Sequence, residues 1–344
     1  MKQSLLFSAN FALRNICRNF ALSIYKTQIV SILDSLKQLM THYSPTAPVD
    51  DLETILWSLD YLYRRDRDEA ETTAIVKYSD ECGLLADAIG FITNSTPQKL
   101  RTKALEALEK ISCHKEDITM YLTQHGSFFD NINMILRDVN QKSDWPKIAW
   151  IASNLILDGP LLENPLVVKG TIGELIRKLR ISKLSTAFVT EISVVIENIL
   201  HTYSTQKIQP CETWRTLVVD LIESVQLMLS KHHMFVQQAL DSLIQLLNKF
   251  KGSDKKRAVL QVVYSFGVHK QLYKLVRDCP EIFPHAKLLL ETHFPTYLAS
   301  KVGDSHASRE LHEHQESSEC CESRHTHIHI YLDCQHSSTA DRNP

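Results

Sequence analysis

The chain has 344 residues, of which 44% are hydrophobic and 23% charged, so it can bury a core typical of a globular protein or of an elongated array. Its formal net charge of −2 gives no global attraction to nucleic acid or to a membrane surface. The 9 glycines stand against about 24 at average usage, which disfavours turn-rich β folds and glycine-rich phosphate loops and favours helices.

Apolar residues recur every three to four positions along most of the chain, which predicts amphipathic helices. The first helices are expected over 27–40 and 49–63, with two prolines in 42–48 ending the first of them. Further helices are predicted in groups of three, short then medium then long. The groups comprise 71–78, 82–92 and 97–111; then 116–124, 127–139 and 144–157; then 164–169, 171–180 and 184–200.

The third helix of each group carries a recurring polar or aromatic position. The marks are Asn15, Tyr61, Lys110, Asn154, Asn198 and Gln245, separated by 46, 49, 44, 44 and 47 residues. Helical repeats of about 40–47 residues are those of armadillo and HEAT arrays. In such solenoids each unit packs on its neighbours, and the third helices are expected to line a groove.

Trp150 and Asn154 stand four residues apart in Lys147–Asn154, so an indole and an amide share one helix face. The indole can hold a cationic side chain, and the amide can bond to an extended peptide backbone. Trp57 and Tyr61 repeat the same spacing. A tryptophan at helical spacing is more often part of the core, and that alternative stays open for each pair.

Several of these segments resemble the importin α (karyopherin α) family, the armadillo adaptors of nuclear import. The resemblance covers about residues 8–298 and rests on segments that match the family's fourth to seventh and tenth repeats: Asn10–Asn19, Leu56–Leu62, Ala104–Leu108, Ile148–Asn154, Gly267–Leu275 and Ala286–Phe294. It implies an all-α, right-handed superhelical solenoid of about six repeats after a partial first one. The expected domains are an orphan third helix over 1–20, the solenoid over 21–302 and a tail over 303–344.

The resemblance further implies an adaptor that binds basic nuclear localisation signals and moves between cytoplasm and nucleus. The matching peptide-binding positions are Trp150, Asn154, Ser153, Glu191, Asn198, Asn15, Arg18, Trp57 and Tyr61. Phe11 and Val194 stand where the family has tryptophan, Glu106 and Lys110 replace an arginine and an asparagine, and Lys147 replaces an acid. Lys147 should repel a cationic peptide, an effect that Glu106 could offset.

The partners follow from the same comparison. Basic signal peptides are expected at a partial minor site, and importin β is not, because no segment matches its binding region. An export receptor docks near the family's tenth repeat, which corresponds to residues 267–298, although no residue of that contact is carried over. The alternative is a degenerate armadillo scaffold that no longer reads basic signals; Lys110, Lys147 and Val194 favour it.

Other chemistry finds little support. The sequence contains no nucleophile elbow, zincin, phosphate-loop or dinucleotide-binding motif, so we expect no enzyme and no cofactor. No apolar run is long enough for a bilayer. Residues 303–344 hold seven histidines and three cysteines among polar residues, and are predicted to be disordered. Zinc binding is the alternative there, but Cys320 and Cys321 are adjacent rather than in a metal-ligand spacing. Residues 4–18 should fray, since no companion helices cover their apolar side.

Overall fold

The computed structural model describes residues 2–18, 26–43, 49–64, 69–114, 116–157, 166–181, 183–205, 212–231, 235–250, 255–278 and 283–301. Over these ranges the regular structure is helical, without strands. Two compact units, residues 1–220 and 221–344, divide the chain. The predicted all-α class is therefore confirmed. The tail over 303–344 lies outside the described residues.

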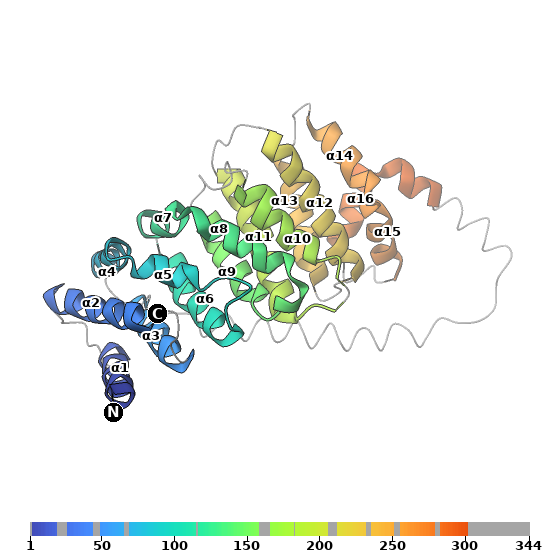
Figure 1. Cartoon of the computed structure of the whole chain (residues 1–344). Coiled ribbons are helices and arrows are strands. Elements are labelled where there is room, and N and C mark those ends of the chain that lie inside the picture. The colour runs from blue at the N-terminus through green and yellow to red at the C-terminus, as the bar shows by residue number, and fades with distance from the viewer. Residues whose placement is uncertain are drawn as a thin grey trace. The chain divides into compact units, whose positions relative to one another are not determined.

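The first unit is a succession of helices, drawn from blue to green in Figure 1. They are α1 (Lys2–Arg18), α2 (Lys26–Tyr43), α3 (Val49–Leu62), α4 (Glu69–Glu81), α5 (Leu84–Gly90), α6 (Gln98–Ser112), α7 (Glu116–Gln124), α8 (Gly126–Arg137), the 3-10 turn η1 (Val139–Gln141), α9 (Trp145–Ile156), the π-helix η3 (Leu166–Ile172), α10 (Gly173–Lys178) and α11 (Thr186–Thr205). Next comes α12 (Glu212–Lys231), which contains the boundary between the units.

The second unit continues with α13 (Val236–Lys249), α14 (Lys255–Ser265), α15 (Val268–Asp278) and α16 (Pro284–His293). In it α15 packs against α14 and α16, and α16 also contacts α13.

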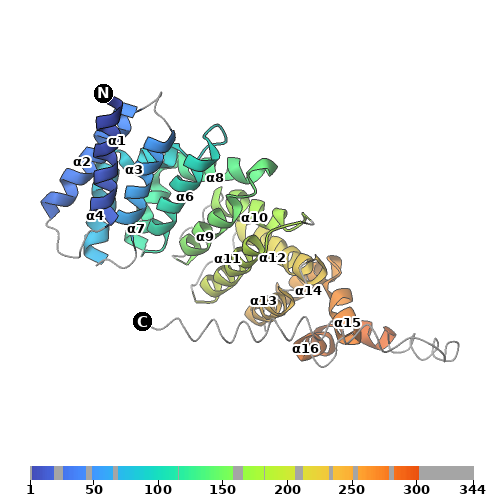
Figure 2. The ribbon, with the colours of Figure 1, turned by 90° about the horizontal axis from the view of Figure 1, so that it is seen from below.

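Third helices of the first unit pack in chain order: α1 on α3, α3 on α6, α6 on α9, and α9 on α11 (Figure 2). Hydrogen bonds link successive third helices about one repeat apart. The amide of Asn198 donates to the Ser153 carbonyl, 45 residues earlier, and Thr202 donates to the Ile156 carbonyl, 46 residues earlier. Helix groups that contact mainly their neighbours in sequence are typical of a helical solenoid.

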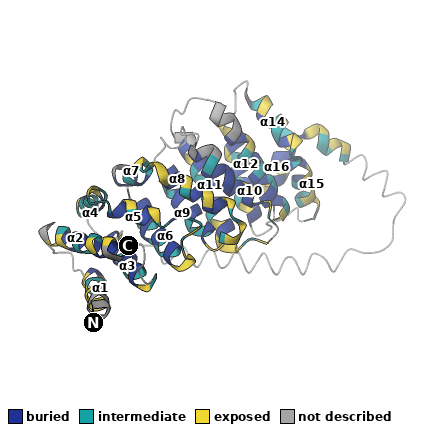
Figure 3. Ribbon diagram, in the orientation of Figure 1, coloured by how far each residue is buried: buried dark blue, intermediate teal, exposed yellow. Residues whose placement is uncertain are grey.

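Apolar residues at helical spacing form the core between these layers (Figure 3). Leu105 and Leu108 of α6 and Ile148 and Ile151 of α9 are fully buried. Burying each such side chain contributes about 1.5–3 kcal/mol. The apolar residues whose spacing predicted these helices are thus the residues that form the core.

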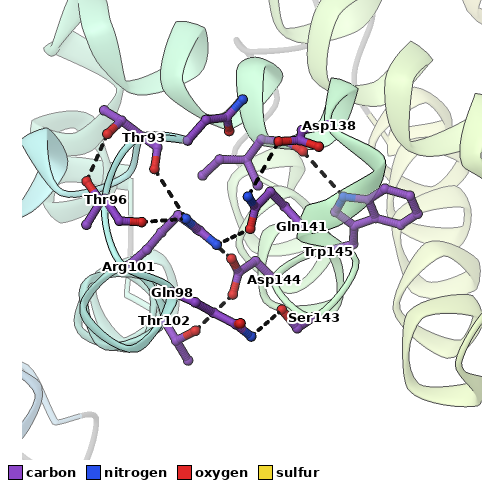
Figure 4. Close-up of polar contacts among 12 residues, drawn as sticks. Thr93, Thr96, Gln98, Arg101, Thr102, Asp138, Gln141, Ser143, Asp144 and Trp145 are labelled. Atoms are coloured by element: carbon purple, nitrogen blue, oxygen red, sulfur yellow. Dashed lines mark hydrogen bonds and ion pairs between the residues drawn. The ribbon is translucent and has the colours of Figure 1, made fainter.

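A buried polar network fixes the start of α6 to the start of α9 (Figure 4). Arg101 and Asp144 are 1% and 0% exposed, and the Arg101 Nε lies 2.6 Å from the Asp144 Oδ2. The Thr102 hydroxyl donates to the other oxygen of Asp144 over 2.9 Å. The Arg101 guanidinium also donates to the Thr96 carbonyl over 2.8 Å and to the Gln141 side chain. The two buried charges are therefore paired with each other and hydrogen-bonded to further polar groups.

Two predicted boundaries were wrong. Residues 71–78 and 82–92 were expected to be a short and then a longer helix, but α4 extends to Glu81 and α5 begins at Leu84. Gly83 has φ of 76°, the left-handed conformation that glycine adopts without steric cost, and this places the break. The break expected between 164–169 and 171–180 does not occur, since η3 runs directly into α10.

Helix α1 packs against α3, and the Asn10 amide donates to the Asp51 carbonyl over 2.8 Å. Phe11 and Ile16 are nevertheless 50% and 48% exposed, as expected for a helix whose apolar side is not fully covered. Fraying of residues 4–18 stays a prediction.

Candidate peptide-binding face

The third-helix face is the surface formed by the solvent-facing sides of α3, α6, α9 and α11. Its residues are Trp57, Asp60, Tyr61, Lys103, Glu106, Glu109, Lys110, Lys147, Trp150, Asn154, Glu191 and Asn198, all of them half-buried. Each comes from a helix that buries its opposite side against the core, so the packing described above positions these side chains. The face presents aromatic, acidic, basic and amide groups within one unit.

Trp57 is occupied by cations of the chain itself. The Lys103 Nζ lies 3.4 Å from the centre of the indole ring, and the Arg14 Cζ lies 4.7 Å from it. The Tyr61 ring lies 5.7 Å from that of Trp57, as the i, i+4 spacing predicted, and Arg64 lies 5.5 Å from the Tyr61 ring. A cation within about 6 Å of a ring centre is attracted by the ring.

Glu106 joins two lysines on neighbouring helices. One oxygen forms an ion pair with Lys103 on its own helix α6, and the other lies 3.3 Å from the Lys147 Nζ on α9. The repulsion expected from Lys147 is therefore reduced, because its charge is paired. The Lys110 Nζ lies 3.9 Å from the Glu109 carboxylate on the same helix.

Trp150 and Asn154 lie on the face, half-buried, and not in the core. The Trp150 Nε1 is buried with no hydrogen-bond partner among the described residues. The Asn154 amide nitrogen donates to the Ser112 hydroxyl over 3.3 Å and contacts the Cys113 sulfur at 3.4 Å. Ser153 is only 2% exposed, and its hydroxyl donates to the Trp150 carbonyl, so this predicted contact is corrected: Ser153 belongs to the helix packing.

Glu191 and Asn198 extend the face onto α11. The Glu191 Oε2 is buried without a partner among the described residues. Burial raises the pKa of the Glu191 carboxyl, and the neighbouring Glu109 raises it further. Burial also raises the pKa of Glu109, although Lys110 and Lys147 oppose that change. One N–H of the Asn198 side-chain amide donates a hydrogen bond to the Ser153 carbonyl.

The remaining predicted residues lie at the α1 end. Asn15 is half-buried and Arg18 exposed, and neither joins the charged cluster around Glu106 and Glu109. Val194, at a position where the family has tryptophan, is half-buried on α11.

Sequence reasoning missed four participants: Arg14, Asp60, Lys103 and Glu109. The Asp60 Oδ1 is buried without a partner in the described part of the chain, and burial raises the pKa of its carboxyl, an effect that the nearby cation of Lys110 opposes. Asp60 lies three residues after Trp57, and Lys103 three before Glu106, so helical spacing from the recognised positions could have found both.

The second unit has a separate aromatic cluster. His269 is 1% exposed, with both ring nitrogens unpartnered among the described residues. Its ring stacks on Tyr264 with centres 4.1 Å apart and meets the Tyr297 ring edge-on at 4.5 Å. Burial lowers the pKa of His269, and Lys270 lowers it further. Tyr264 and Tyr297 also line a shallow cavity of about 360 Å³ with Arg257.

In the described part of the chain, no three His, Cys, Asp or Glu side chains gather as metal ligands would. The predicted zinc alternative concerns the tail and is not addressed by this finding. Among the described helices none combines the length and apolar character needed to cross a membrane.

Comparison with known proteins gives information on the fold. No family model matches the chain, and no curated protein matches it. Among solved structures the chain is similar to the crystal structure of an engineered protein from a structural genomics consortium, with a TM-score of 0.53 and 14% sequence identity. That similarity covers 76% of this chain and 98% of the other. That similarity is one of fold alone, a fold that is all-helical and solenoid-like over the described residues of this chain.

Proposed function

We propose that the third-helix face binds an extended Lys- and Arg-rich peptide, as an adaptor of the importin α type does with a nuclear localisation signal. In this proposal the helix groups are armadillo repeats in a right-handed superhelix, and the protein works in cytoplasm and nucleus. The matched residues Trp150, Asn154, Glu191 and Asn198 form the centre of the site. Ser153 is left out because it is buried.

Two observations carry the proposal: on the third-helix face, an acid has a buried oxygen without a partner, and an indole has no covering cation, both among the described residues. Among the described residues the buried Oε2 of Glu191 has no hydrogen-bond partner, and the neighbouring charge that shifts its pKa is another acid, Glu109. A buried acceptor without a hydrogen bond costs about 1–3 kcal/mol. A lysine or arginine side chain of a peptide would supply N–H donors and positive charge at this point. No cation of the described residues lies over the Trp150 ring, in contrast to Trp57.

The side-chain amides of Asn154 and Asn198 also form hydrogen bonds within the protein, and these bonds limit how each amide can bind a peptide. The Asn154 amide nitrogen donates to both Ser112 and Cys113, so its carbonyl oxygen is the group left to accept from a peptide backbone. Asn198 uses one N–H for the Ser153 carbonyl and keeps its second N–H and its carbonyl oxygen for a peptide. We therefore expect a peptide N–H group to donate to Asn154, whereas Asn198 can also donate to a peptide carbonyl.

The direct test is titration of a fluorescently labelled Lys-rich peptide against the wild type, Trp150→Ala and Glu191→Gln. A lost cation–π contact of about 0.5–2 kcal/mol weakens binding roughly 2- to 30-fold in Trp150→Ala. Met134→Ala on α8, which is exposed and lies off the face, is the control and should bind like wild type. Equal affinity in wild type and Trp150→Ala would remove this face from the function.

One observation favours a second function, a scaffold that no longer reads basic signals. Lys103, Lys110 and Lys147 place three cations on the same face, and each is paired with or held near an acid that a peptide would need. Under this alternative the peptide would show no saturable binding to any variant. Two further proteins serve as baits in a pull-down. We propose that importin β does not bind the chain, and that an export receptor binds it at residues 267–298.

A further inference from the structure

We propose that Lys103 and Arg14 act as resident ligands of Trp57, so that this end of the third-helix face is closed to an external basic peptide. The inference rests on the proposed function and specifies which part of the face a peptide can reach. It restricts the footprint to α6, α9 and α11, although the sequence pairs Trp57 with Tyr61 in the same way as Trp150 with Asn154.

The two cations reach Trp57 from different neighbours of α3. Lys103 comes from α6 and Arg14 from α1, and both helices pack against α3. At 3.4 Å from the ring centre, the Lys103 Nζ lies well inside the distance of about 6 Å over which a ring attracts a cation. Its side chain is only 15% exposed, so the interaction is weakly screened by solvent.

Lys103 is also held in place from its other side. Glu106 forms an ion pair with it, and Glu106 is itself fixed by Lys147 at 3.3 Å. The order Arg14, Trp57, Lys103, Glu106, Lys147 is thus a continuous run of contacts from α1 to α9. A lysine of the peptide could reach the Trp57 ring only by displacing Lys103. Because Lys103 belongs to the same chain, it competes for the ring at a high effective concentration.

The Trp150 end differs in the features that matter for a cation. No charged side chain of the described residues covers its ring, its Nε1 has no partner, and Glu191 faces another acid instead of a lysine. Two tryptophans that look equivalent in the sequence therefore differ: cations of the chain cover the Trp57 ring, whereas none of the described residues places a cation over the Trp150 ring.

The test reads the two indoles separately by NMR, using the full chain and a Lys-rich peptide as the probe. The indole N–H signals of Trp57 and Trp150 are assigned with Trp57→Phe and Trp150→Phe. The peptide is then titrated into wild type, into the double variant Arg14→Met/Lys103→Met, and into the control Lys77→Met. Methionine keeps a linear apolar stem without the charge, and Lys77 is an exposed lysine of α4 whose ion pair is with Glu81.

We expect the peptide to shift Trp150 but not Trp57 in the wild type and in Lys77→Met. In the double variant both signals should shift, and a peptide with two Lys clusters should bind about tenfold more tightly than a peptide with one, as a second cation–π contact provides. Unchanged Trp150 signal in the free double variant shows that the variant is folded.

The outcomes separate this inference from the proposed function. A Trp57 shift in the wild type overturns the inference while leaving peptide binding intact, and so does a double variant in which Trp57 stays unmoved while Trp150 responds. If no signal moves in the wild type but Trp57 responds in the double variant, the adaptor function of the natural chain is refuted and the resident cations are supported. Unmoved signals in every variant refute both.

Discussion

Asp144→Asn should be among the most destabilising single substitutions, because it leaves the buried Arg101 guanidinium without its counter-charge. Asp144 accepts from the Arg101 Nε at 2.6 Å and from the Thr102 hydroxyl at 2.9 Å, and both charged side chains are at most 1% exposed. Hydrogen bonds to a charged group contribute about 1.5–3 kcal/mol each, so the two together give roughly 3–6 kcal/mol. Breaking one partner of a buried pair typically costs about 3–5 kcal/mol, in agreement with that range.

Urea unfolding, followed by circular dichroism, measures the loss, and amide hydrogen exchange locates it at the starts of α6 and α9. Local exchange is needed because repeat arrays can depart from two-state unfolding. Ser143→Ala is the matched control: Ser143 is exposed and accepts a hydrogen bond from Gln98 at 2.8 Å, so its removal should cost below about 1 kcal/mol.

The double variant Arg101→Met/Asp144→Leu should recover part of the loss, since it removes both charges together. Recovery will be incomplete because the Thr96 carbonyl and Gln141 lose their donor. A loss below about 1 kcal/mol in Asp144→Asn, or a double variant worse than the sum of its single changes, would refute the view that the charges stabilise α6 and α9 through each other.

Two further predictions concern packing and pH. Gly170→Ala should destabilise the first unit by about 1–3 kcal/mol, because a Cβ there would lie 2.5 Å from the Asn133 Nδ2, whereas Gly90→Ala has nothing within 4 Å and should be neutral; equal melting temperatures of the two variants would contradict this. The second unit should lose stability as pH falls through about 6.5, because His269 is buried with a pKa below that of the unfolded chain, which then binds more protons. His269→Phe should weaken this dependence, and an unchanged pH profile in thermal unfolding would be the contrary result.

Helix positions were predictable to a useful degree because burial follows the same spacing as the apolar residues. In α9, Ile148, Ile151, Ala152 and Leu155 are buried, and they recur at the intervals from which the helix was inferred. The boundary at Gly83 was missed, since apolar periodicity does not register the backbone conformation of a single glycine. The π-helical start of η3 was missed for a similar reason: a π turn changes the hydrogen-bond register without changing composition.

The states of the site residues were less predictable than their positions. Trp57 and Trp150 occupy comparable places in their helices, yet the difference between them depends on Lys103, which is 46 residues from Trp57 and reaches it only through packing of α6 on α3. Likewise, the amide of Asn154 was expected to donate to a peptide and instead donates to Ser112. Spacing along one helix gives the face on which a side chain lies, and the neighbouring helix decides what it contacts.

A residue kept for binding, and not for folding, should show opposite effects on the two, and Glu191 provides that contrast. Because burial raises the pKa of Glu191, its ionised form is disfavoured in the folded state, so stability should decline as pH rises from the unfolded pKa of about 4.5 through the folded value. Glu191→Gln should therefore raise the urea midpoint at pH 7 and flatten that decline, while weakening peptide binding. Asn198→Ala is the comparison. The hydrogen bond from the Asn198 side-chain amide to the Ser153 carbonyl joins α11 to α9, so its loss should lower the urea midpoint. If Glu191→Gln lowers both stability and affinity, as Asn198→Ala is expected to do, Glu191 is a packing residue and the acid at this point was never available to a ligand.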